Sequence, residues 1–179
     1  MHEQNTIYIV LTYTGTMLSK IIKIYTGAEY SHVSLALDSN LDEMYSFGRL
    51  NPYNPFIGGF VKEGINKGTF NRFPKTKSSI YSLSVSQKQY EKIKKLVYNI
   101  KENRDNYRFN IIGLFANGLH IKYQRKNSFY CAEFIKYILD NCYLDLDLPE
   151  LVKPNDFKKV KKLSLVYKGK LNEYNKSNL

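Results

Sequence analysis

The chain has 179 residues, of which 43% are hydrophobic, enough for one substantial core and too few to suggest two. We expect residues 1–179 to form one globular domain whose last several residues are frayed. No apolar run approaches the roughly twenty residues needed to cross a bilayer. The first residues also lack the basic-then-apolar layout of a secretion signal, so we expect a cytoplasmic protein.

Positive charge dominates, with 27 Lys and Arg against 16 Asp and Glu and a formal net charge of +11. Such a surface attracts phosphates, anionic lipid head groups or acidic polymers. Many of the lysines fall on predicted helix faces or in the tail, where solvation explains them. Because no base-reading motif accompanies the charge, nucleic acid is disfavoured as a partner, whereas an anionic membrane surface stays among the candidates.

The first third of the chain predicts a strand, a helix and a hairpin. Residues 7–13 have the pattern of a buried strand, and residues 17–25 that of a short helix closed by Gly27. A strand follows at 31–37, and after a turn residues 43–47 are expected to return beside it.

The strand at 31–37 carries the first chemically informative residue, His32. A period of two predicts that the alternate residues fall on opposite faces, with Val33, Leu35 and Leu37 on one and His32, Ser34 and Ala36 on the other. Small neighbours would let a helix lie close over the face that carries the imidazole.

The stretch 51–68 holds two prolines and four glycines, which predicts an ordered loop that covers part of the surface. Spacing typical of a capping box at Ser86 marks the start of an amphipathic helix. The other elements are expected as strands at 69–73, 79–85 and 163–166 and helices at 106–119, at 128–142 and from Asn155.

Two cysteines and three histidines permit six thiol–imidazole pairs. Cys131 lies in the first turn of its predicted helix, where the helix dipole and unpaired N–H groups favour a thiolate. Cys142 lies near the other end, where the dipole opposes one, and is expected as core filler. Since His2 belongs to the chain end and His120 to a predicted loop, the chemistry favours Cys131 with His32.

The same counts bear on covalent and metal chemistry. The two cysteines fall 11 residues apart on one predicted helix, so we expect two free thiols and no disulfide framework. The few histidines do not cluster with carboxylates at ligand spacing, so no metal and no cofactor is expected.

Three segments together resemble a known family. Residues 31–37, 44–49 and 129–134 are similar to motifs of the circularly permuted papain-fold thiol hydrolases. That group includes the YiiX-like bacterial proteins and the lecithin:retinol acyltransferase family and is related to the NlpC cell-wall peptidases. In unpermuted relatives the cysteine helix precedes the histidine strand, whereas here the histidine comes first. The resemblance spans residues 6–170, although the specific motifs cover less.

The resemblance implies an α+β, permuted papain-like (NlpC-type) fold, in which a central antiparallel sheet or half-barrel packs against helices that include the cysteine helix. It also implies that Cys131 is the nucleophile and His32 the general base, with a third polar residue orienting the imidazole. Counting through the hairpin puts Ser46 closest to that third position, with Glu43 as the rival if the turn is shorter.

Other positions near the expected site have weaker assignments. The backbone N–H of Cys131 would hold an oxyanion together with one further donor. Tyr13 and Tyr130 are candidates for that donor by position, although packing is the commoner role of a tyrosine in this chain. Glu133 turns away from the cysteine face of its helix and is expected to be structural.

These residues leave three functions open. The first is a cysteine amidohydrolase or peptidase that forms an acyl-enzyme on a small amide, peptide or ester. The second is a thiol acyltransferase acting on lipid-like substrates, and the third is a catalytically silent basic module that binds anionic partners.

Overall fold

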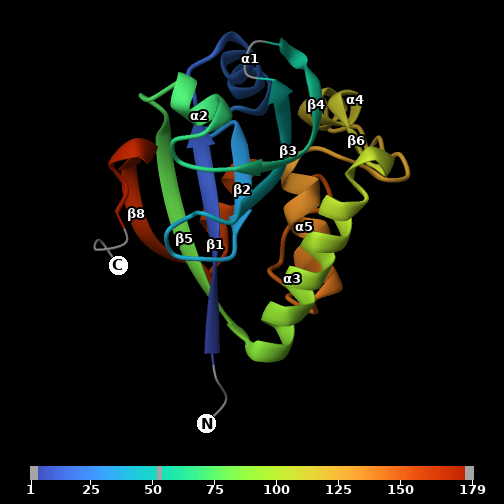
Figure 1. Ribbon diagram of the computed structural model, residues 1–179. Helices are drawn as coiled ribbons and strands as arrows, with labels where there is room; N and C mark the ends of the chain where they lie inside the picture. Colours follow the sequence, from blue (N-terminus) through green and yellow to red (C-terminus); the bar gives the residue numbers. More distant parts are fainter. Residues whose placement is uncertain (1–3, 52–53, 176–179) are drawn as a thin grey trace.

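The computed structural model describes residues 4–51 and 54–175 and has an α+β architecture (Figure 1). Its centre is a six-stranded sheet of order β4-β3-β2-β1-β5-β8, in which every neighbouring pair is antiparallel. The strands are β1 (Gln4–Tyr13), β2 (His32–Ala36), β3 (Met44–Asn51), β4 (Asn54–Glu63), β5 (Lys77–Ser86) and β8 (Ser164–Lys170). A short parallel pair, β6 (Arg108–Phe109) and β7 (Ser128–Phe129), forms a separate two-stranded sheet that contacts β4.

Five α-helices and three 3₁₀ segments are found in the described part of the chain. They are α1 (Met17–Thr26), α2 (Gly68–Arg72), α3 (Gln87–Glu102), α4 (Ile111–Gly118) and α5 (Cys131–Asn141), with the 3₁₀ segments Arg104–Asn106, Pro154–Lys159 and Leu171–Glu173. The helices α3 and α5 lie together beside the sheet (Figure 1). Within residues 4–51 and 54–175, no helix combines the length and the apolar character needed to span a membrane.

Both faces of the sheet are buried, which explains the continuous apolar sequence of β1. Ile7, Ile9 and Leu11 enter a large cluster that also contains the buried residues of α3 and α5. Tyr8 and Val10 point the other way into a smaller cluster with Phe70 of α2 and the C-terminal residues Leu171 and Tyr174. Strand alternation thus places the two helical layers on opposite faces.

Several local predictions are confirmed. Gly27 ends α1 with a left-handed φ of 62°, and Ser86 and Gln89 form the capping box that begins α3. In the cysteine helix, Cys131, Ile135, Ile138 and Cys142 are spaced i, i+4, i+7 and i+11, which predicts one inward face. This face is found, because all four are buried in the large cluster. Both thiols are free.

Two local predictions are wrong, and a third is right about a helix but not about its type. Residues 51–68, expected as a loop, contain β4, which forms a hairpin with β3. β4 is an edge strand, where residues that usually break strands are tolerated. Gly58 also allows the Phe109 ring to pack closely, because a Cβ built on Gly58 would stand only 2.8 Å from that ring. Residues 69–73 form the helix α2 instead of a strand, and the basic segment from Asn155 is a 3₁₀ helix.

The packing of α5 also corrects an expectation. Val33 and Leu35 belong to the same cluster as the buried side of α5, whereas Ala36 belongs to the opposite cluster. The helix therefore covers the aliphatic face of β2, and the small residues on the histidine face have another purpose. His2 and residues 176–179, which were expected to be frayed, lie outside the described residues.

The anchoring of α5 can be tested through Phe134, whose ring centroid lies 5.3 Å from that of Phe47 and 5.7 Å from that of Phe60. We expect Phe134→Ala to lower the free energy of unfolding by about 3–5 kcal/mol, because it leaves a cavity between helix and sheet. Tyr137→Ala, on the exposed side of the same helix, is the matched control and should cost about 1 kcal/mol. Urea denaturation measures both, and equal losses would contradict this account of the packing.

Candidate active site

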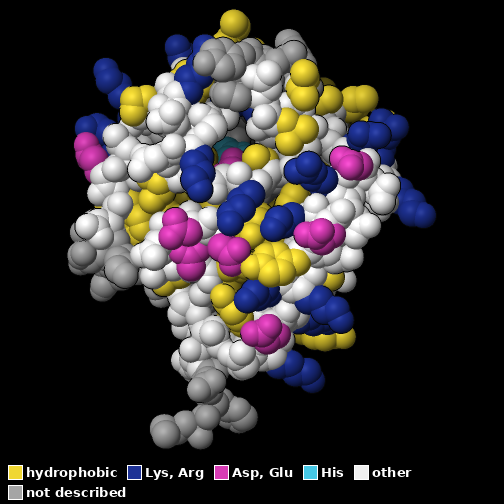
Figure 2. Space-filling view, viewed as in Figure 1, with side chains coloured by type: hydrophobic (Ala, Val, Ile, Leu, Met, Phe, Trp, Pro, Cys, Tyr) yellow, Lys and Arg dark blue, Asp and Glu magenta, His cyan; other side chains and the backbone are white. Residues whose placement is uncertain are grey.

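Three titratable side chains meet around the start of β2. His32 is the first residue of β2, Glu63 the last of β4 and Cys131 the first of α5. All three line one cavity, of about 70 Å³, whose walls include the apolar side chains of Phe70, Phe109 and Leu114. Figure 2 shows a recess on the viewed face with histidine and acidic colouring at its floor.

The imidazole of His32 lies between the other two groups. Its Nε2 is 3.0 Å from Oε1 of Glu63, and the hydroxyl of Ser34 donates to the other carboxylate oxygen. Cys131 lines the same cavity as His32, and its side chain helps to raise the pKa of the imidazole. Because Nε2 is taken by Glu63, Nδ1 is the nitrogen left for the thiol.

Burial and charge act against each other at this site. Burial by itself lowers the pKa of His32, but the negative charge of Glu63 and the hydrogen bonds to Cys131 and Glu63 outweigh it and raise that pKa to about 10. For Glu63, burial raises the pKa, whereas the charge of His32 and hydrogen bonds hold it below its ordinary value. The imidazole is therefore an imidazolium and the carboxyl a carboxylate at neutral pH.

Strand register explains how a residue from the other layer reaches His32. β2 and β3 pair only at Leu35–Tyr45 and Ala36–Met44, although both strands continue beyond these positions. They part toward His32, and the first turn of α5 meets the imidazole at this opening. Cys131 is 4% exposed, so its thiol opens only into the cavity.

Small residues on the histidine face make room for the two charged side chains. Ser34 binds the Glu63 carboxylate, and a Cβ built on Gly48 would stand 3.2 Å from Cε1 of His32. Ser46 Oγ is fully buried beside Glu63, where it helps to lower the pKa of that carboxyl without forming a hydrogen bond of good geometry. The sequence Ser-x-Gly on β3 thus provides space for the His32–Glu63 pair.

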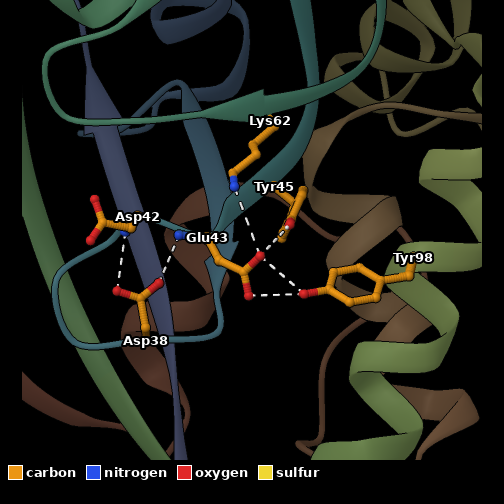
Figure 3. A network of polar contacts seen from close by, with 6 residues as sticks. All are labelled: Asp38, Asp42, Glu43, Tyr45, Lys62 and Tyr98. Atoms are coloured by element: carbon orange, nitrogen blue, oxygen red, sulfur yellow. Dashed lines mark hydrogen bonds and ion pairs between the residues drawn. The ribbon is translucent and has the colours of Figure 1, made fainter.

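The partner of the imidazole is Glu63, in place of Ser46 or Glu43. Glu43 instead accepts hydrogen bonds from Tyr45 at 3.1 Å and from Tyr98 of α3 at 2.9 and 3.0 Å, and Lys62 lies 3.8 Å away (Figure 3). This network ties the β2–β3 turn to α3. Glu63 was missed because it lies in the stretch predicted as a loop; had 54–63 been recognised as a returning strand, its period of two would have placed Glu63 on the face of Ser46.

The structure places the two candidate oxyanion tyrosines elsewhere. The buried hydroxyl of Tyr130 donates to the carbonyl of Val152 at 3.1 Å and accepts from Asn117 at 2.6 Å, so it is fully used in packing. Tyr13 lines a neighbouring groove and has the Lys23 ammonium 4.9 Å from its ring centroid. Neither is among the residues that line the cavity of Cys131.

The other titratable residues near α5 have structural positions. Glu133 accepts a hydrogen bond from the backbone N–H of Tyr130 at 3.1 Å and so caps the helix, and burial raises its pKa to about 7. Cys142 is fully buried at the far end of α5, where burial raises its pKa. His120 is exposed. In residues 4–51 and 54–175, no group of three His, Cys, Asp or Glu side chains could hold a metal ion.

The His32–Glu63 pair should give stability a distinctive pH dependence. The raised pKa of His32 adds to the free energy of unfolding fully below its ordinary value of 6.5, and this stabilisation is lost as pH rises toward about 10. The lowered pKa of Glu63 stabilises the fold above 4.5, and this stabilisation is lost at lower pH. We expect Glu63→Gln to cost about 3–5 kcal/mol between pH 4.5 and 6.5, and less on either side, because it leaves a buried charge without its partner. Denaturation across pH measures this, with exposed Glu29→Gln as control; a flat difference contradicts the pairing.

Gly48 allows a steric test of the imidazole position. An alanine methyl there would press on His32 and Ser46, so we expect Gly48→Ala to slow alkylation of Cys131 about tenfold by displacing the imidazole. Gly59 pairs with Gly48 across β3 and β4, and its added methyl would meet only the flexible Leu50 side chain. Gly59→Ala is therefore the matched control, and the expectation fails if both variants react at the wild-type rate.

Comparison with known proteins adds no assignment to this geometry. The chain matches no protein-family model, no curated protein and no solved structure. The resemblance to permuted papain-fold thiol hydrolases therefore rests on the motifs at residues 31–37, 44–49 and 129–134.

Proposed function

We propose that the protein is a cysteine-dependent hydrolase, an amidase or peptidase, with Cys131 as nucleophile, His32 as general acid and base, and Glu63 as the residue that orients the imidazole. The observation that carries this proposal is that the His32 imidazole lies between a carboxylate and a thiol. A buried imidazole so held keeps its proton at neutral pH and favours a neighbouring thiolate.

The arrangement also supports a permuted papain-like fold. A helix that begins at the cysteine packs against an antiparallel sheet, and the histidine comes from an early strand of that sheet. A carboxylate from a third element completes the set of three groups that thiol hydrolases use. The order of histidine before cysteine in the chain is the order that the permutation requires.

In the first half of the reaction, Sγ of Cys131 attacks the substrate carbonyl carbon and forms the C–S bond. The carbonyl oxygen gains negative charge, which the backbone N–H of Cys131 can stabilise because the first N–H groups of a helix have no acceptor within it. His32 then gives its proton to the leaving amine or alcohol as the C–N or C–O bond breaks. The products of this half are a thioester and the released amine or alcohol.

In the second half, the neutral imidazole takes a proton from water, and the resulting hydroxide attacks the thioester carbonyl. The C–S bond breaks, the carboxylic acid leaves and the thiolate–imidazolium pair is restored. Glu63 keeps the ring orientation throughout, through its contact with Nε2. Its negative charge stabilises the imidazolium whenever the proton is present.

Acyl transfer is the alternative within the same chemistry. The cavity is lined by Phe70, Phe109 and Leu114, an apolar surface that suits an acyl chain. An amine or alcohol acceptor would then replace water in the second half. Mass analysis of the products from a thioester incubated with amines and alcohols separates the two outcomes, since only the transferase forms new amides or esters.

Thiol reactivity tests whether the site is catalytic or silent. A thiol in water is almost fully protonated at pH 6 and reacts slowly there. We expect iodoacetamide to label Cys131 rapidly at pH 6, and His32→Ala to slow this labelling at least about tenfold, because the imidazolium no longer supports the thiolate. Peptide mass spectrometry locates and times the modification.

His120→Ala and Cys142→Ser are the matched controls, since one removes an exposed imidazole and the other a buried thiol at the opposite end of α5. Both should label at the wild-type rate. Slow labelling of the wild type that does not depend on His32 would overturn the hydrolase and favour the silent binding module.

A further inference from the structure

A guanidinium that forms no ion pair with any described residue lies at the cavity that holds the candidate nucleophile. Arg49 follows Gly48 on β3, and a register irregularity between Arg49 and Asn51 interrupts the pairing with β4 there. Such bulges redirect side chains. Arg49 lines the same cavity as Cys131, His32 and Glu63 and also the adjoining groove beside α2.

The donors of Arg49 are not used within the described part of the chain. Its guanidinium carbon lies 5.8 Å from the ring centroid of Phe73, and no carboxylate among the described residues lies within ion-pair distance of it. A guanidinium has five N–H donors and is costly to bury without acceptors. Arg49 is half-buried, and burial lowers its pKa, an effect that Glu63 opposes and Arg72 reinforces.

Balancing the charge of Glu63 does not explain this arginine. One Glu63 oxygen faces His32 and the other accepts from Ser34, so the carboxylate is satisfied without it. The guanidinium of Arg72 lies 5.6 Å from the same Phe73 ring, and its positive charge helps to lower the pKa of Arg49. Lys and Arg side chains also gather around the recess in Figure 2. The entrance is therefore suited to a negative group.

We propose that Arg49 binds an anionic group of the substrate, a carboxylate or a phosphate, and holds it beside the Cys131 thiol. This inference rests on the proposed function, in which Cys131 attacks the substrate. A planar guanidinium binds either anion through two parallel hydrogen bonds. The preferred substrate is then an amide or ester that carries a negative charge close to its reacting carbonyl.

The test compares two alkylating reagents that differ in charge. Iodoacetate carries a carboxylate and iodoacetamide is neutral, and both alkylate the same thiol, so their rate ratio at Cys131 reports the attraction for an anion. The ratio also cancels any general change in thiol reactivity. At fixed ionic strength we expect Arg49→Gln to lower the ratio of the iodoacetate rate to the iodoacetamide rate about tenfold. Arg49→Lys should give an intermediate value, since Lys keeps the positive charge but cannot form two parallel hydrogen bonds to the anion.

Lys67→Gln is the matched control, because Lys67 is an exposed cation in the adjoining groove but does not line the cavity of Cys131. It should leave the ratio within about twofold of wild type, since exposed charges are screened. A wild-type ratio in Arg49→Gln overturns the proposal, and so does an equal loss in Lys67→Gln, which would indicate general surface charge. Circular dichroism checks that each variant is folded.

Protection experiments identify the anion. Inorganic phosphate or acetate bound at Arg49 should slow labelling by iodoacetamide in the wild type and not in Arg49→Gln. The anion that protects better indicates whether the substrate carries a phosphate or a carboxylate. Protection by neither contradicts the proposal. If the ratio depends on Arg49 while His32→Ala has no effect on labelling, the hydrolase fails and an anion-binding cavity remains; the reverse pattern keeps the hydrolase and removes the anion site.

Discussion

The contact between His32 and Glu63 is the constraint on which the rest of the site depends. Two opposite charges with only 20% and 11% of their side-chain surfaces exposed are tolerable because each compensates the other. The pair requires a face of the sheet with small side chains, and β2 and β3 supply Ser34, Ser46 and Gly48 there. It also fixes the ring orientation, so that one nitrogen is left for the thiol.

The His32–Glu63 pair and the Cys131 thiol come from different layers of the fold. The imidazole and carboxylate belong to strands, whereas the thiol begins a helix that packs on the opposite face through Phe134 and Ile135. They meet only because β2 and β3 separate near their ends. The capping of α5 by Glu133 and the burial of Tyr130 then fix the first turn of the helix at this opening.

Local patterns were sufficient to predict most of the secondary structure and two of the three central residues. The first strand, the Ser86 cap and the inward face of α5 follow from periodicity and capping chemistry, which act over a few residues. Glu63 could not be found this way, because the glycines of 51–68 favour a loop, and α2 was missed because the pattern of 69–73 favours a strand. In the structure the glycines permit close contacts with distant side chains such as Phe109, a requirement that no local pattern contains.

Placing Cys131 and His32 in separate layers has a consequence for the protein before it is folded. The two residues are far apart in sequence, and no local segment contains both, so in an unfolded or newly synthesised chain Cys131 has no imidazole held beside it. The sulfur meets the His32 imidazole only when helix and sheet have docked. Under the proposed function, the reactivity of this sulfur therefore depends on tertiary assembly and reports that both layers are in place.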